Sequence, residues 1–206
     1  MRKEEKGFRK IARILDFLLK IATIICIIAV PIMIIGVLII NLASEDILKN
    51  ITGSSITANI GSLRFVINNF NVDLSDFRKN VSFIIACGFV MNLLFIVIMV
   101  EIRKILENVL KDMPFSDNCI KHIRNLGYVV IIASIVNKVC EGIIEYLYSN
   151  LINLEKIMTS TGEISRVTNN ISILNGGTLV IGLLIILLAG VFNYGKYLQE
   201  EYDTTI

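Results

Sequence analysis

The sequence has few of the residue patterns that carry catalysis or metal binding. It contains one histidine, His122, and four cysteines, and none of these residues has a partner at metal-ligand spacing. A glycine-rich phosphate loop, a nucleophile elbow, and paired carboxylates outside residues 126–148 are also missing from it. These absences predict that the protein is not an enzyme and uses no metal or other cofactor. We expect the cysteines to be small apolar packing residues and His122 to lie on the surface.

Long apolar runs, by contrast, dominate the chain. Hydrophobic residues make up 54% of it, and four stretches are long enough to cross a hydrocarbon core, which takes about 20 apolar residues per helix. The third stretch is the weakest, because Lys138, Glu141 and Glu145 interrupt it. The sequence therefore predicts an all-α membrane protein with no large soluble domain. Residues 1–206 are expected to form one four-helix transmembrane domain with spans at residues 21–40, 81–100, 126–148 and 171–192.

The positions of the basic residues predict how the chain is threaded. Thirteen lysines and arginines lie before the first span, between the second and third spans, or after the fourth, against six in the other two connecting segments. Basic residues collect on the cytoplasmic side of a membrane. Both termini and residues 101–125 are therefore expected in the cytoplasm, and residues 41–80 and 149–170 outside the cell. Arg78 and Lys79, just outside the second span, are exceptions to the rule.

The first extracellular segment contains two runs of alternating apolar residues. Ile56, Ala58 and Ile60 form the first run, and Leu63, Phe65 and Ile67 form the second, with Gly61 and Ser62 between them. Alternation on both sides of a glycine-containing turn is typical of a β-hairpin. A small extracellular hairpin and a solvated loop are the two interpretations that this pattern leaves open.

Residues 101–125, which we call the elbow, are expected to form a helix-turn-helix in the cytoplasm. The second span is predicted to continue as a helix until Pro114 and Phe115 break it. Ser116 is placed to cap a new helix, and Asp117 suits the positively polarised first turn of that helix.

The N-terminal residues 3–20 have an apolar face at helical spacing and a basic face opposite it. The apolar face is formed by Phe8, Ile11, Ala12, Leu15, Leu18 and Leu19. Such a helix can lie against anionic lipid headgroups, or it can dock a partner protein. Membrane lipid is therefore the first expected partner of the chain.

A polar stripe in the third span is the strongest local anomaly. At 3.6 residues per turn, one side of that helix would carry Ser134, Lys138, Glu141, Glu145 and Ser149. Ionisable groups in a span are normally paired or line a cavity, so the stripe is expected to face the bundle interior, with Asn92 of the second span as a polar neighbour. It predicts either an ion, proton or ligand site, or a Lys–Glu pair that only fixes the packing of the helices.

Two stretches of the sequence are familiar. The first is Lys111-Asp112-Met113-Pro114-Phe115-Ser116-Asp117-Asn118, followed by Ile123-Arg124-Asn125-Leu126-Gly127, and the second is the run from Val191 through Gln199, Glu200, Glu201 and Asp203 to Ile206, which we call the tail. The pairing resembles an uncharacterised bacterial four-span family, domain of unknown function 2975, the YoaS-like membrane proteins. The likeness covers the architecture from the first span to the tail.

This resemblance implies a role but no chemistry. Members of that family are often encoded beside a small helix-turn-helix regulator, which implies a sensory or regulatory membrane protein working with a cytoplasmic DNA-binding protein, without binding nucleic acid itself. The docking residues expected for such a partner are Pro114, Phe115, Ser116, Asn118, Arg124, Gln199, Glu200, Glu201 and Asp203. An intramolecular contact between elbow and tail is the simpler account of the same residues. A small transporter or immunity-type protein is the alternative function, and a second copy of the chain is a further candidate partner.

Overall fold

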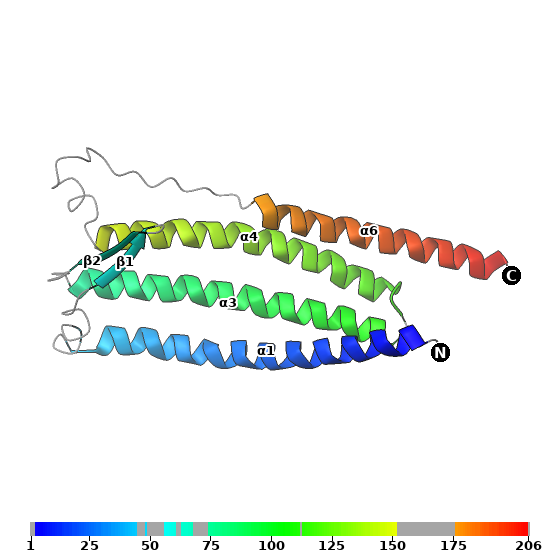
Figure 1. Cartoon of the computed structure of the whole chain (residues 1–206), viewed down its shortest axis with the longest axis horizontal. Coiled ribbons are helices and arrows are strands. Elements are labelled where there is room, and N and C mark those ends of the chain that lie inside the picture. The colour runs from blue at the N-terminus through cyan, green and yellow to red at the C-terminus, as the bar shows by residue number, and fades with distance from the viewer. Residues whose placement is uncertain are drawn as a thin grey trace. The chain divides into compact units, whose positions relative to one another are not determined.

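The computed structural model describes residues 3–44, 48, 56–60, 63–67, 74–111, 113–151 and 176–205. These residues form four long helices and one pair of strands (Figure 1). In chain order the elements are α1 (Lys3–Leu42), β1 (Ile56–Ile60), β2 (Leu63–Ile67), α3 (Leu74–Leu110), α4 (Asp117–Leu151) and α6 (Gly176–Thr205).

All four helices are long and apolar enough to cross a membrane, which confirms the predicted multi-pass architecture. Even the shortest, α6, has 30 residues and is about 45 Å long at 1.5 Å per residue, whereas a hydrocarbon core is about 30 Å thick. The charged ends of the helices therefore extend past the apolar spans. α6 begins at Gly176, and residues 171–175 of the predicted fourth span lie outside the described residues.

Contacts divide the chain into two compact units. Unit 1 contains the elbow, and unit 2 contains the segments predicted to be extracellular. Unit 1 comprises Met1–Val30, Val90–Lys138 and Ser172–Ile206, and unit 2 comprises Pro31–Phe89 and Val139–Ile171.

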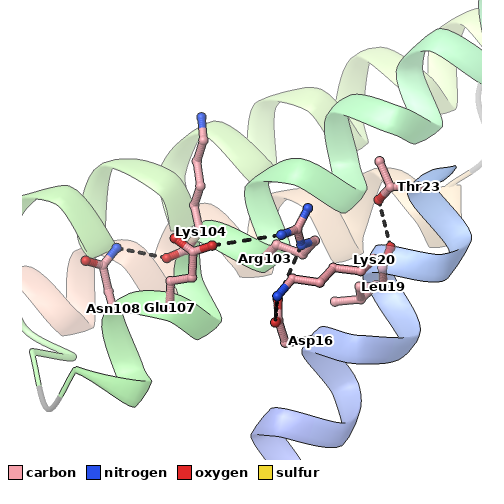
Figure 2. Close-up of polar contacts among 8 residues, drawn as sticks. All are labelled: Asp16, Leu19, Lys20, Thr23, Arg103, Lys104, Glu107 and Asn108. Carbon is pink, nitrogen blue, oxygen red and sulfur yellow. Dashed lines mark hydrogen bonds and ion pairs between the residues drawn. The ribbon is translucent and has the colours of Figure 1, made fainter. Parts of the chain in front are cut away.

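In unit 1, α1 packs on α3 through a narrow seam. Ala12, Leu19 and Thr23 are buried at spacings of seven and four residues, and the hydroxyl of Thr23 donates a 2.7 Å hydrogen bond to the carbonyl of Leu19 (Figure 2). That bond satisfies a polar group that has no water nearby in a bilayer. The predicted apolar face of residues 3–20 was only partly right, because Ile11, Leu15 and Leu18 are exposed while Ala12 and Leu19 pack.

The other helix pair of unit 1, α4 and α6, crosses at two glycines. A Cβ atom at Gly127 would lie 2.5 Å from Cγ1 of Ile186 and 3.0 Å from the carbonyl oxygen of Gly182. A Cβ atom at Gly182 would lie 2.5 Å from Cγ1 of Ile131 and 3.1 Å from the carbonyl oxygen of Gly127. The backbones approach closely only because both positions lack a side chain, as is common between membrane helices.

A small apolar core lies beside this crossing. Cys119 and Ile123 of α4 and Ala189 of α6 are buried together, and the residues packed around them include Ile105, Ile185 and Phe192. Three helices of unit 1 therefore meet at the elbow, and Cys119 packs as the sequence predicted.

In unit 2, the end of α1 is held by the start of α3. The guanidinium of Arg78 donates hydrogen bonds to the carbonyls of Asn41 at 3.3 Å and Ala43 at 2.6 Å, and the amide of Asn41 reaches the hydroxyl of Ser82 at 3.0 Å. The last carbonyls of a helix lack intrahelical partners and carry partial negative charge, which a cation stabilises. Arg78 was an exception to the predicted charge distribution, and its position at the α1 terminus is the physical reason for a basic residue there.

The two strands of unit 2 pair in antiparallel register. Ile56 lies opposite Ile67, Ala58 opposite Phe65, and Ile60 opposite Leu63. The apolar positions of the two alternating runs are therefore opposite one another, and residues 61 and 62 between the strands lie outside the described residues.

Candidate functional site

The turn between α3 and α4 is built by hydrogen bonds at Met113 and Ser116. The amide of Ser116 bonds to the carbonyl of Met113 at 3.3 Å, so Pro114 and Phe115 are the central residues of a tight turn. The hydroxyl of Ser116 accepts a 3.3 Å bond from the amide of Cys119, which confirms the predicted N-terminal cap of α4. This turn fixes the direction in which Phe115 leaves the backbone.

Phe115 packs against the start of the tail. Its ring lies 5.5 Å from the ring of Phe192, centroid to centroid, with the planes tilted by 41°. A Cβ atom at Gly195 would lie 2.9 Å from the Phe115 ring, so any larger residue at this position of α6 would displace the ring. Elbow and tail are therefore in contact.

An ion pair fixes the same two segments. The amine of Lys196 lies 2.7 and 2.8 Å from the two carboxylate oxygens of Asp117, and 3.4 Å from Glu200 one turn further along α6. The hydrogen bond to Asp117 raises the pKa of Lys196, which lies beyond the predicted fourth span. The simpler account of the elbow and tail, an intramolecular contact, is therefore present in the structure.

Two further side-chain contacts link helices of unit 1. Nδ1 of His122 lies 2.6 Å from a carboxylate oxygen of Glu101, joining α4 to α3. Nε of Arg103 lies 3.3 Å from Asp16, joining α3 to α1, and a weaker 4.0 Å contact runs from Arg103 to Glu107 (Figure 2). Together with the Asp117–Lys196 pair, these contacts connect each helix of unit 1 to the next through side chains that the structure describes.

Asp16 is the central acid of the α1–α3 contact. Its carboxylate is 14% exposed and accepts from Lys20 at 2.8 Å as well as from Arg103. The hydrogen bond from Lys20, reinforced by Arg103 and opposed by burial, lowers the pKa of Asp16, which precedes the charge-free run from Ile21 to Ile40. The acid is therefore held ionised.

The rest of the tail stays exposed. On α6, Gly195 and Lys196 face the elbow. Tyr194, Tyr197 and Tyr202 are 63%, 59% and 67% exposed. The predicted docking residues Gln199, Glu200 and Glu201 are also exposed, and the side chain of Asp203 lies outside the described residues. The first turn of the tail is therefore packed on the elbow, whereas the described acidic and aromatic side chains that follow it are exposed.

The other predicted docking residues lie on the elbow. Pro114 and Ser116 are partly buried in the turn, whereas Asn118 and Arg124 of α4 are exposed. The structure brings Phe115 and Asp117 to the tail.

The members of the polar stripe differ in burial. Ser134 is buried at 5% exposure and Lys138 is partly buried, but Glu141 and Glu145 are exposed. The side chain of Ser149 lies outside the described residues. The amide of Asn92 donates a 3.0 Å hydrogen bond to the carbonyl of Cys26, so it contributes to the α1–α3 contact. Within the described part of the chain, His, Cys, Asp and Glu side chains form no cluster of three or more that could hold a metal ion.

His122 is the residue that sequence reasoning missed. It was predicted to be a surface histidine, whereas its side chain is only 21% exposed and contacts Glu101. His122 and Glu101 are far apart in the sequence, and only the antiparallel packing of α3 and α4 reveals their pairing. Glu101 follows directly after the charge-free second span. This position was the one signal in the sequence that Glu101 could make a contact at the end of that span.

Comparison with known proteins places the chain in a family but gives it no activity. A family model described as "Protein of unknown function (DUF2975)" matches residues 67–206, which include β2 partly and α3, α4 and α6 completely. No curated protein and no solved structure matches the chain. Because the match covers more than half of the residues and includes both the elbow and the tail, the resemblance noted in these segments is confirmed. The chain belongs to the DUF2975 family of proteins of unknown function.

Proposed function

We propose that the protein is a regulatory or sensory component of the bacterial cell membrane, and that it acts with a cytoplasmic helix-turn-helix regulator. In this proposal both termini and the elbow are cytoplasmic, and the extracellular segments and the polar stripe receive the signal. The elbow and tail pass that signal to the regulator. The protein itself performs no catalysis and binds no nucleic acid directly.

The observation that carries the proposal is the contact between elbow and tail. Phe115 on Phe192 and Asp117 on Lys196 join the two segments into one surface. The same contacts fix the first turn of the tail, so the exposed turns that follow are presented in a defined direction. A rigid, prearranged segment loses less conformational entropy on binding than a mobile one.

Charge supports a DNA-binding protein as the partner. After Lys196, the tail contains the exposed acids Glu200 and Glu201 and no further lysine or arginine. Proteins that bind DNA carry a basic surface, to which an acidic helix is complementary. The same acidic residues would be repelled by nucleic acid and by anionic headgroups, so a basic protein is the best-matched partner.

Affinity capture tests this proposal. The tagged full-length protein, extracted from membranes of its own cells, is expected to retain a stoichiometric cytoplasmic regulator. The double variant Glu200→Lys, Glu201→Lys should lose it. Glu107→Lys, which reverses a charge on an exposed residue of α3, should retain it. A parent protein that captures no regulator, or a tail variant that captures as much as the parent, would refute the proposal.

The proposed orientation has its own test. Ser55→Cys and Ser160→Cys should react with a membrane-impermeant maleimide in intact cells, in a background whose native cysteines are replaced by serine. Cys119 is 0% exposed and is unsuitable as the cytoplasmic marker, so Asn118→Cys, an exposed neighbour, replaces it. Labelling of Asn118→Cys without permeabilisation would reverse the orientation.

The burial of Ser134 and the partial burial of Lys138 favour the second candidate function, a small transporter or immunity-type protein that uses the polar stripe. Polar groups inside a predicted span mark substrate or ion pathways in many membrane proteins. Ion or peptide flux in liposomes that is abolished by Lys138→Met, together with no captured regulator, would favour this function. Light scattering in detergent would show whether a second copy of the chain takes part in either function.

A further inference from the structure

The side of α1 that points away from α3 is uncovered in the segment before the predicted first span. At 3.6 residues per turn, Lys10, Ile14 and Phe17 lie about 140–160° around the helix from the buried seam on α3. Ile14 and Phe17 are 51% and 61% exposed, and Lys10 is exposed as well. All three precede the charge-free run that begins at Ile21, so they lie outside the expected hydrocarbon core. We call this side the α1 face.

The tail has an uncovered side of the same kind. Phe192, Gly195 and Lys196 contact the elbow. Tyr194 and Tyr197 lie about 150° around α6 from the mean direction of these three residues, and both are exposed. We call this side the tail face. Since side chains on both faces are exposed in the folded chain, the two faces do not cover each other within the described part of one copy.

The two faces carry opposite charge. On α1, Lys10 lies on the face and Arg13 lies at its edge, and both side chains are exposed. On α6, Glu201 lies on the side of the two tyrosines and Glu200 lies at its edge, and both are again exposed. Contact between the faces would therefore pair basic with acidic side chains and remove neighbouring apolar groups from water.

Contacts between the helices of unit 1 place these opposite charges at the same depth. The contacts that fix the depth of each helix against the next are Asp16 with Arg103, Glu101 with His122, and Asp117 with Lys196. Neighbouring helices run antiparallel, so counting residues through these contacts places Asp16 level with a point about three residues before Lys196. Lys10 is then level with a point about three residues after Lys196, next to Glu200 and Glu201.

We propose that a second copy of the chain covers these faces, with the α1 face of one copy packed against the tail face of the next. Anionic lipid headgroups would attract the α1 face but repel the acidic tail face, whereas a second copy matches both. The inference does not rest on the proposed function, because the contact needs no regulator. A regulator bound to Glu200 and Glu201 would compete with the second copy for the same side chains.

Crosslinking between differently tagged copies tests the proposal. The four native cysteines are replaced by alanine, and Lys10→Cys is introduced into one tagged copy and Glu201→Cys into the other. The purified full-length proteins are reconstituted together in phosphatidylcholine liposomes without any other protein and treated with a short bismaleimide. A product that carries both tags is expected. Lys104→Cys, at an exposed lysine of α3, replaces Lys10→Cys in the matched control and should give much less of this product.

A charge exchange gives a second readout that leaves the native cysteines in place. Energy transfer between fluorescently labelled copies in the same liposomes measures their association. Lys10→Glu should weaken association by about two- to fivefold, as expected for one exposed ion pair, and adding Glu201→Lys should restore it.

Each result decides the proposal. A crosslinked product no more abundant than that of the Lys104→Cys control, or a charge exchange that does not restore association, would overturn the contact between copies. Affinity capture that finds no regulator would refute the proposed function but not this contact, because the liposomes contain no regulator.

Discussion

Unit 1 and unit 2 hold their helices together by different chemistry. In unit 1, the described contacts between helices include the ion pairs Asp16–Arg103 and Asp117–Lys196 and the contact of His122 with Glu101. In unit 2, the described contacts between helices include the guanidinium of Arg78 on backbone carbonyls and the amide of Asn41 on a hydroxyl. In unit 1, ionisable side chains thus contact one another near the predicted cytoplasmic ends of the helices. In unit 2, the charged side chain of Arg78 instead binds backbone carbonyls at the end of α1.

The comparison teaches where specificity between membrane helices can arise. Lipid is as apolar as leucine, so burial of apolar side chains gives neighbouring helices little reason to prefer one another. The register of one helix against its neighbour is instead selected by charged side chains near the ends of the spans and by close backbone approach within the spans. Unit 1 has both devices, since the glycine crossing of α4 and α6 lies along the same helices as the Asp117–Lys196 pair.

The largest effect is expected at the glycine crossing. Gly127→Ala would place a Cβ atom 3.1 Å from the backbone nitrogen of Ile186, so the helices must separate and stability should fall by about 1–3 kcal/mol. Gly190→Ala is the matched control, because nothing lies within 4 Å of its added Cβ atom and alanine is the better helix former. Melting midpoints in detergent measure both, and equal midpoints would show that the crossing does not hold unit 1 together.

A smaller effect is expected from the arginine of unit 2. Arg78→Met removes a charged donor from the carbonyls of Asn41 and Ala43, and because these hydrogen bonds are exposed or only partly buried, stability should fall by about 0.5–1.5 kcal/mol. Lys79→Met is the control, because Lys79 is 76% exposed and should change stability by less than about 0.5 kcal/mol. If Arg78→Met and Lys79→Met have the same melting midpoint, Arg78 does not stabilise the end of α1.

The Asp16–Arg103 pair should show a still smaller coupling. Its side chains are 14% and 25% exposed, and Lys20 remains on Asp16 after Arg103 is removed. A double-mutant cycle with Asp16→Asn and Arg103→Met is therefore expected to give a coupling of about 0.5–1 kcal/mol. Strictly additive losses would mean that this contact does not help select the register of unit 1.

The smallest expected effect is a pH dependence at Asp16. The pKa of Asp16 is lowered in the folded protein from an ordinary value of 3.8, so the unfolded chain takes up the proton first as the pH falls. The stabilisation is complete above 3.8 and is lost as the pH falls through the lower folded pKa. The stability difference between the parent and Asp16→Asn should therefore shrink at acid pH, and a difference that stays constant would contradict the assignment.

Much of the fold could be predicted because it depends on local patterns. Long apolar runs predict the four helices, and Ser116 predicts the start of α4, since a capping hydroxyl acts within one turn of its own backbone. The partners of the candidate site were harder to predict. The contacts of Phe115 with Phe192 and of Glu101 with His122 depend on which helices pack together and in what register, and composition does not specify this. The polar stripe was predicted from helical periodicity alone, which gives the angular position of a side chain but not the neighbour it faces.

The narrow seam of α1 has a consequence for how freely its sequence can change. Outside Ala12, Asp16, Leu19 and Thr23, the surface of this helix consists largely of exposed isoleucines and leucines. At positions of α1 that face lipid, one apolar side chain can replace another of similar length. Exchanges among isoleucine, leucine and valine at these positions are therefore expected to leave the fold unchanged. Two descendants of one ancestor could then share the seam and little else in α1.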